Sequence, residues 1–363
     1  MRLRTTLLAT VMLLALTITG AGCAPGGQQS DSGSGETATG PEYEWRCSES
    51  LAPTSTVAEQ TRMFCTIVNG LSEGRIHIEH YAGAAIGNDE ENLDQISGGE
   101  LFIGRVSPYS SYQAVQNLKG LPFAGSCWAG FDRLWYQDDS VIQNCIEWSW
   151  NQIGVHSLFL AENGPQVYCN SKREITTPDD FEGLKIRVPP SDVYVKTFQR
   201  MAPKGIGETI AWSEVYPSLE RGVVDGSVMY VCDYVAGGYH EVAPYLTDIN
   251  QMYNYADMIV NLEYWNSLPA DVKELLEYAG EAAEDFGRFN NRKMYDITLQ
   301  AARDAGCTIT LLSPEERQAF INNVQPYELY EELYADMLEE YFPGQQMYDK
   351  LVNQVKEAES LCA

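Results

Sequence analysis

The chain has 363 residues, a formal net charge of −27 at pH 7, and 44% hydrophobic and 11% aromatic residues. This length and hydrophobic content fit a packed globular protein large enough for two lobes. The acidic excess argues against nucleic acid and anionic membrane as partners, because both repel a negatively charged surface.

The first 23 residues have the pattern of an export signal. A basic start precedes an apolar run over residues 7–18, and small residues then lead to Cys23. Such a run suits a signal-peptide core and is too short to span a bilayer. We predict a lipoprotein signal peptide over 1–22 and a lipid on Cys23, which would hold the protein outside the cytoplasm, in the periplasm or at the outer cell surface. Gly20 stands where such signals usually carry leucine, so secretion without a lipid is the alternative.

Residues 23–41 are small and polar and show no apolar periodicity. Such a segment buries too little surface to offset its ordering entropy, so we predict a flexible tether. No later run has the length and apolarity of a membrane span. The membrane is therefore expected as a partner only through the lipid anchor.

Eight further cysteines predict disulfide bonds, because an even number in an exported protein favours pairing. The absence of CxxC pairs disfavours zinc, and no metal site is expected. We expect at least three disulfides to form. The expected pairings are Cys47–Cys65, Cys127–Cys145, Cys169–Cys232 and Cys307–Cys362. The first two join a strand or loop to its own following helix, the third stays within the second lobe, and the fourth fastens the C-terminal helix.

Hydrophobic periodicity predicts alternating strands and helices along the rest of the chain. The predicted strands are 44–47, 76–81, 101–106, 154–159, 166–169 and 184–188, and the first helices are 56–71 and 88–97. Thr177 and Pro178 open a short helix, and Ser213 is predicted to cap another. The repeated strand–helix–strand order indicates a mostly parallel sheet with flanking helices.

One predicted helix is unusually long. The pattern from Pro269 to about Ala305 is helical with no internal proline. Roughly 37 residues at 1.5 Å each extend about 55 Å, which exceeds one lobe of a protein of this size. We therefore expect this helix to run along both lobes, and the chain after Pro314 to be mostly amphipathic helix.

Four motifs occur in a characteristic order: NSKR at 170–173, GLKIRVP at 183–189, WSEVY at 212–216 and GVVDG at 222–226. Together they resemble the DctP-type solute-binding subunits of TRAP (tripartite ATP-independent periplasmic) transporters. The resemblance covers roughly residues 44–310. Each motif is weak alone, whereas the ordered set is specific.

The resemblance implies an α/β protein with the two-lobed periplasmic binding protein fold, a hinge and a long lobe-spanning helix. Lobe I would comprise 42–163 plus 255–295, and lobe II 164–254 plus 296–363 with the C-terminal helices. The implied function is capture of a small organic acid and its delivery to the integral membrane subunits of a TRAP transporter. No cofactor and no chemistry on the ligand are expected.

Arg187, in the GLKIRVP strand, matches the arginine that grips the ligand carboxylate in this family. A guanidinium suits the role because its planar donors fit a carboxylate bidentately. Trp212 is predicted to pack against the ligand body. Ser107 and Tyr109 follow a strand of the first lobe and are candidates for the facing wall, with a small polar loop end as the alternative.

Two departures from the family pattern affect the expected ligand. Gln166 stands where many members carry a second arginine, and Met229 lies in a segment that is often polar. Both changes favour a monocarboxylate with an apolar or aromatic body over dicarboxylates and sugar acids. Arg105 is the residue that would supply a second positive charge if this interpretation fails.

Two other functions compete with transport. An extracytoplasmic receptor that reports ligand occupancy to a sensor protein would have nearly the same sequence. A secreted enzyme is the weaker alternative, because the chain has no GxSxG, Walker or HExxH motif.

Overall fold

The structure, a computed structural model, describes residues 40–107 and 114–362. The predicted signal peptide, Cys23 and Tyr109 lie outside these ranges, as does nearly all of the predicted tether. Across the described part of the chain, no helix combines the length and apolarity that crossing a bilayer requires.

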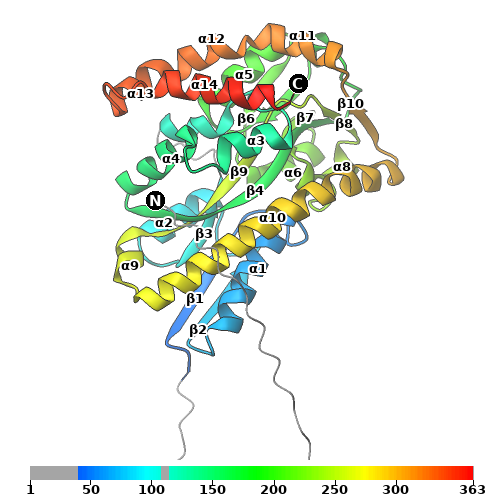
Figure 1. Cartoon of the computed structure of the whole chain (residues 1–363). Coiled ribbons are helices and arrows are strands. Elements are labelled where there is room, and N and C mark those ends of the chain that lie inside the picture. Colours follow the sequence, from blue (N-terminus) through cyan, green and yellow to red (C-terminus); the bar gives the residue numbers. More distant parts are fainter. Residues whose placement is uncertain (1–39, 108–113, 363) are drawn as a thin grey trace, which may run out of the picture. The chain divides into compact units, whose positions relative to one another are not determined.

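The described residues form a mixed sheet with helices on its faces (Figure 1). Its strands are β1 (Tyr43–Ser48), β2 (Ile76–Tyr81), β3 (Ile103–Val106), β4 (Val155–Asn170), β5 (Lys185–Val188), β6 (Ile206–Thr209), β7 (Gly226–Tyr230), β8 (Tyr245–Asp248), β9 (Tyr253–Asn261) and β10 (Thr308–Leu311). Their order across the sheet is β2-β1-β3-β9-β4-β7-β5-β6, with β8 paired to β4 and β10 paired to β8.

The α-helices are α1 (Thr56–Leu71), α2 (Asp89–Ser97), α3 (Trp128–Trp135), α4 (Val141–Gln152), α5 (Asp192–Met201), α6 (Val215–Glu220), α7 (Val231–Tyr234), α8 (Tyr239–Val242), α9 (Leu262–Ser267), α10 (Ala270–Asp304), α11 (Pro314–Val324), α12 (Pro326–Tyr330), α13 (Asp336–Tyr341) and α14 (Met347–Ser360). Short 3₁₀ segments are η1 (Ala114–Gly120), η2 (Pro178–Phe181) and η3 (Trp212–Glu214), and η4 (Glu331–Ala335) is a π-helical stretch.

Local patterns predicted the first elements well. Helix α1 and strand β2 have the predicted bounds, 56–71 and 76–81. The hydroxyl of Ser55 accepts a hydrogen bond from the Ala58 backbone N–H at 3.2 Å and so satisfies one of the free donors at the start of α1. One face of α1 is buried, which explains why helical periodicity located it.

The prediction of a mostly parallel sheet is wrong in the middle of the sheet. β1 runs parallel to β2 and β3, and β5 parallel to β6 and β7, but β9 and β4 pair antiparallel with each other and with their other neighbours. The two strands predicted at 154–159 and 166–169 are one strand, β4, which pairs with β9 over 155–165 and with β7 over 166–170. The chain continues from one part of this strand to the other through a β-bulge.

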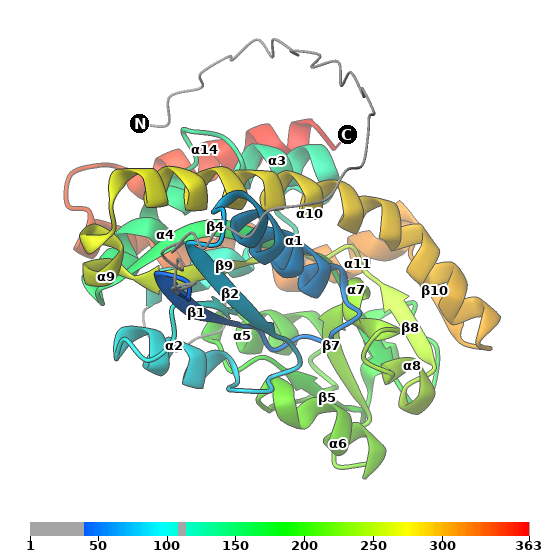
Figure 2. The same ribbon diagram turned by 90° about the horizontal axis from the view of Figure 1, so that it is seen from below.

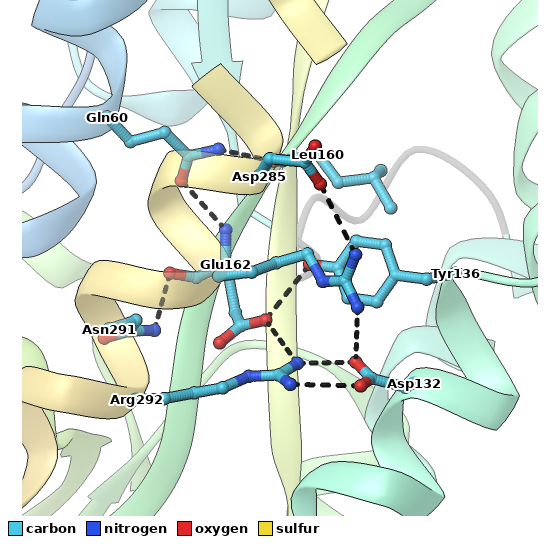
Figure 3. Close-up of polar contacts among 9 residues, drawn as sticks. Gln60, Asp132, Tyr136, Leu160, Glu162, Asp285, Asn291 and Arg292 are labelled. Carbon is cyan, nitrogen blue, oxygen red and sulfur yellow. Dashed lines mark hydrogen bonds and ion pairs between the residues drawn. The ribbon is translucent and has the colours of Figure 1, made fainter. Parts of the chain in front are cut away.

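This bulge lies between Glu162 and Gly164, where β4 passes from one predicted lobe to the other. Gly164 has φ +78, and a Cβ there would lie 2.8 Å from the Nδ2 of Asn291 on α10. That Nδ2 donates to the Glu162 carbonyl at 2.9 Å (Figure 3). The bulge therefore requires glycine for both its backbone conformation and its contact with α10.

A partly buried ionic network surrounds the same bulge (Figure 3). The Glu162 carboxylate accepts from the Tyr136 hydroxyl at 3.2 Å and from Arg292 at 3.4 Å. Arg292 also binds both carboxylate oxygens of Asp132, and Arg288 lies 3.2 Å from that carboxylate. The network joins α10 and α3 to β4 and holds the strand where it bends.

The long helix is confirmed: α10 has 35 residues over Ala270–Asp304. It packs against α1 and β4, and further along against α7 and β10. Figure 2 shows it running beside α1 and continuing toward β10. It therefore contacts elements of both predicted lobes.

The C-terminal helices also contact both predicted lobes, not lobe II alone. Helix α11 packs against α5, whereas α14 packs against α3 and α4. Leu351 and Val355 of α14 belong to the same buried cluster as Phe131 of α3 and Trp150 of α4. Most of the apolar core of the lobe I strands is continuous with this cluster.

The predicted disulfide pairings are wrong. Among the described residues one disulfide is present, Cys127–Cys362. The six cysteines without a disulfide partner are Cys47, Cys65, Cys145, Cys169, Cys232 and Cys307. Cys127 caps α3 and Cys362 follows α14, and the two helices pack together, so the bond joins residues 235 positions apart. Proximity in sequence was a poor guide because the pairing depends on this helix contact.

Candidate functional site

A cavity of about 70 Å³ lies between residues of the two predicted lobes. On one side the lining residues follow β1, β2 and β3 or lie at the start of α2. On the other side they lie at the end of β5 or just before α6. The lining residues are Ser50, Ala84, Asn88, Asp89, Glu90, Ser107, Arg187, Pro190, Ala211, Trp212 and Ser213.

Arg187 is 1% exposed and lies near the carboxyl end of β5. Its Nε donates to the Ile210 carbonyl at 2.8 Å, and its Nη1 donates to the Val228 carbonyl at 3.4 Å. These bonds fix the direction of the guanidinium, which lines the cavity. Strand ends beside a crossover are where open α/β sheets bind ligands.

Trp212 lies in η3 and is half-buried at the cavity. Its ring centre is 5.6 Å from the Arg187 Cζ, and it packs against the rings of Tyr230 and Tyr239 at 6.2 and 5.5 Å. The predicted cap at Ser213 is wrong, because Ser213 lies inside η3 and the N-cap of α6 is Glu214. The aromatic side chain still reaches the cavity through the turn that precedes α6.

Asp89 forms the centre of the opposite wall. It is the first residue of α2, whose N-cap Asn88 forms a capping box with Glu91. Its carboxylate accepts the Ser50 hydroxyl and, at 3.0 Å, the Ser107 backbone N–H. Ser107 therefore lies at the cavity, in the wall that faces Arg187, and is not merely a polar loop end. Asp89 is a further residue of this wall that the sequence did not indicate.

Arg105 lies directly behind this wall and is 1% exposed. Its Nη1 is 3.4 Å from each oxygen of Asp89 and 3.2 Å from the Ser50 hydroxyl. Its Nη2 donates to Asn163 at the β4 bulge at 2.9 Å. Arg105 is thus the second cation near the cavity, but a carboxylate of the protein already pairs with it.

Two more carboxyl groups are buried in this region. Glu49 is 0% exposed, and among the described residues no side chain donates a hydrogen bond to its carboxyl group. Burial raises the pKa of Glu49 to about 8, and the nearby Arg105 guanidinium lowers it only in part. Burial also raises the pKa of Asp233 to about 6, against a hydrogen bond from the Ala52 backbone N–H.

Gln166 and Met229 do not line the cavity. Gln166 is buried on β4, and its Nε2 donates to the Tyr194 hydroxyl at 3.2 Å. Met229 packs inside an apolar cluster, with its sulfur 3.7 Å from the Cys169 sulfur. Side chains alternate between the two faces of a strand, and on β7 this alternation turns Met229 into the core. The structure therefore places neither Gln166 nor Met229 at the cavity, where both were predicted to lie.

The lobe I wall was largely missed from the sequence. The signal for it was present in the run Asn88–Glu91, where a cap residue is followed three positions later by glutamate, just after a loop. That pattern locates the start of a helix. It does not show that the start faces a cavity across from Arg187, because that depends on the packing of distant strands.

The described residues contain no cluster of three or more histidine, cysteine, aspartate or glutamate side chains suited to a metal ion. The site consists of one buried arginine, one aromatic ring, two carboxylates and small polar groups. Such a combination of groups is suited to binding and orienting a charged small molecule.

The fold and the cavity are those of a two-lobed extracellular binding protein. The chain matches the DctP family, described as bacterial extracellular solute-binding protein, family 7, over residues 47–336, and it belongs to that family. It is 27% identical over 329 residues to a solute-binding protein of Chromohalobacter salexigens, covering 87% of this chain and 90% of the relative. It is 26% identical over 282 residues to the C4-dicarboxylate-binding periplasmic protein DctP of Rhodobacter capsulatus, covering 76% and 82%.

The fold is also similar to solved structures. The sugar acid binding protein DctPAm of Advenella mimigardefordensis, crystallised with galactonate, aligns with a TM-score of 0.78 at 23% identity, covering 88% of this chain and 99% of that one. The two-lobed α/β fold is therefore confirmed. The family match confirms the expected function: the protein is a solute-binding protein of the TRAP type and not an enzyme.

Proposed function

We propose that the cavity between the two lobes is the ligand site, that Arg187 binds the ligand carboxylate and that Trp212 packs against the ligand body. The observation that carries this proposal is the fixed, 1%-exposed Arg187 guanidinium in the cavity lining. A preset guanidinium loses little freedom when it binds a planar carboxylate. The relatives support an acid, since one is named for C4-dicarboxylates and one was crystallised with galactonate.

The lobes proposed for closure are 42–163 plus 255–295 and 164–254 plus 296–363. The chain crosses between them at the bulge of β4, at β9 and along α10. A few residues that take up a backbone change at such crossings are the usual hinge of binding proteins. Closure would bring the Asp89 wall and the Arg187 wall onto the ligand and remove its water.

The experiment that tests the site is a thermal-shift screen of small organic acids on the mature protein without Cys23, followed by the same screen on Arg187→Ala. At least one acid should raise the unfolding temperature of the wild type, because a ligand that binds only the folded state stabilises it. The variant should lose that shift. An acid that stabilises the variant as much as the wild type would place the binding site elsewhere.

The anchor is part of the same proposal. A lipid on Cys23 with residues 23–41 as a tether would keep the binding protein beside its membrane subunits, which raises its effective concentration at those subunits. Expression of the full chain and of Cys23→Ala, followed by separation of membranes, tests it. The wild type should sediment with membranes and the variant should not; equal recovery of both in the soluble fraction would favour secretion without a lipid.

A further inference from the structure

The charges around the cavity are unbalanced toward the negative. Arg187 stands on one wall, while Asp89 and Glu90 line the other. Behind that wall Arg105 pairs with Asp89, and the carboxyl group of Asp233 is buried nearby.

A ligand that carries only a carboxylate worsens this imbalance. Its negative charge pairs with Arg187 but faces Asp89 across a small cavity, and like charges at short range repel. A second carboxylate on the ligand has no cation to meet at that wall, since Arg105 lies behind Asp89 and is already in contact with it at 3.4 Å. The net charge of −27 adds a field that disfavours anions and leaves a neutral zwitterion unaffected.

We propose that the ligand is a small zwitterion, with a carboxylate bound by Arg187 and a cationic nitrogen held against the Asp89 carboxylate. This inference rests on the proposed role of Arg187 and extends it to the class of ligand. Glu90 also lines the cavity, and although the residue is exposed, its negative charge adds to the attraction for the cation. Trp212 suits the same ligand, because the face of an indole ring attracts cations.

Asp89 is well placed for this role because its carboxylate is held from several sides. The Ser50 hydroxyl, the Ser107 backbone N–H and Arg105 all donate to it. Its side chain keeps 15% exposure and lines the cavity. Donors on the inner side orient the oxygens, so a ligand cation meets a fixed acceptor, which lowers the ordering cost of binding.

The proposal separates zwitterions from acids of the same shape. Two matched sets test this on the wild-type protein by calorimetry at pH 7 and low salt. One set is 4-aminobutanoate, pentanoate and 4-hydroxybutanoate, which differ only in the terminal group. The other is glycine betaine and 3,3-dimethylbutanoate, which share a shape and differ in the charge.

In at least one set the zwitterion should bind about tenfold more tightly than the partner that lacks the cationic nitrogen, a modest value for a partly exposed charge pair. Asp89→Asn should reduce that preference to within about threefold, while Asp94→Asn, an exposed substitution on α2 outside the cavity lining, should keep it. The comparison on the wild type does not depend on the folding of either variant.

Three results would overturn the proposal. Pentanoate and 3,3-dimethylbutanoate lack the cationic nitrogen, so if each binds as tightly as its zwitterionic counterpart or more tightly, the cation has no role. If 4-hydroxybutanoate binds as tightly as 4-aminobutanoate, Asp89 recognises any hydrogen-bond donor and not a cation in particular. Binding of succinate above all of these would indicate that Arg105 serves the ligand. In each of these cases Arg187→Ala still abolishes binding, whereas binding that survives Arg187→Ala contradicts the proposed site itself.

Discussion

The guanidinium of Arg187 lies 5.6 Å from the centre of the Trp212 ring. Two backbone carbonyls, from Ile210 and Val228, hold the guanidinium in that position. The ring covers one side of the charge and shields it from water, which strengthens its attraction for a ligand carboxylate. In the proposed site, this pair places the charge that binds the acid beside the ring that packs against the ligand body.

Replacement of Arg187 by alanine should weaken ligand binding by roughly thirtyfold or more, because truncating one partner of a buried charge pair costs about 2–5 kcal/mol. Lys185→Ala is the matched control, since Lys185 lies two residues earlier on β5 and is exposed. Calorimetry with the best acid from the screen measures both, and circular dichroism checks the fold. Unchanged affinity in a folded Arg187→Ala protein would contradict the assigned role.

The fold was predictable from the sequence where the evidence is local. Helix α1 and strand β2 came out with their bounds because each has one buried face, which gives a clear period. The long helix α10 was predictable for the same reason. The antiparallel pairing of β4 with β9 was not, because their partners are about a hundred residues apart and local patterns carry no register.

The site divides in the same way. Arg187 and Trp212 lie in motifs, and the structure places both at the cavity. Met229 lies next to a motif, and the structure places it in the core, since one step along a strand reverses the direction of a side chain. Asp89 carries no motif, and its position opposite Arg187 follows from the packing of the two walls.

The Cys127–Cys362 disulfide should contribute strongly to stability. It closes a loop of 235 residues, and cross-links over loops of this size restrict the unfolded chain by an amount worth about 3–5 kcal/mol. Cys127→Ser should therefore lower the thermal unfolding midpoint by several degrees. Cys307→Ser, which changes a free and partly exposed thiol, should have a small effect.

Alkylation of the unfolded mature protein without Cys23 gives an independent check of the pairing. Mass spectrometry before and after reduction should show six reactive thiols rising to eight. A peptide linking residue 127 to residue 362 should be recovered from a non-reducing digest. Recovery of Cys47–Cys65 or another of the originally expected pairs would show that the six thiols are not free after export.

The bulge of β4 should tolerate no side chain at position 164. Gly164 and Gly154 both have positive φ, +78 and +74, but only the former has a neighbour within 4 Å of an added Cβ. Gly154→Ala should cost about 1 kcal/mol from backbone strain alone. Gly164→Ala should cost more, because its Cβ displaces the Asn291 amide that bonds to the Glu162 carbonyl.

Urea unfolding of the two glycine variants measures this difference. A larger loss in Gly164→Ala identifies the contact with α10 as the extra contribution. Equal losses would mean that Asn291 moves aside without cost and that only the backbone conformation matters. When Asn291→Ala, which removes the side chain that blocks position 164, is combined with each glycine variant, the difference in stability between Gly164→Ala and Gly154→Ala should become smaller.

Three buried carboxyl groups should each make the protein less stable as the pH rises from about 5 to 8. Burial raises the pKa of Glu49 to about 8, of Glu162 to about 7 and of Asp233 to about 6. In each case the folded state holds a proton that the unfolded state releases near its ordinary pKa, between about 4 and 4.5. Folding is therefore favoured below that value, and the advantage is lost as the pH approaches the raised pKa.

Glu49→Gln isolates the largest of these contributions. The amide has nearly the same size as the protonated carboxyl and cannot ionise, so the variant should lose less stability than the wild type between pH 5 and 8. Glu44→Gln is the control, because Glu44 lies on the exposed side of β1. Thermal unfolding midpoints at half-unit pH steps measure all three proteins. If the curves of wild type and Glu49→Gln are parallel, Glu49 ionises at its ordinary pKa in the folded protein, and water or Arg105 must solvate it more fully than its burial indicates.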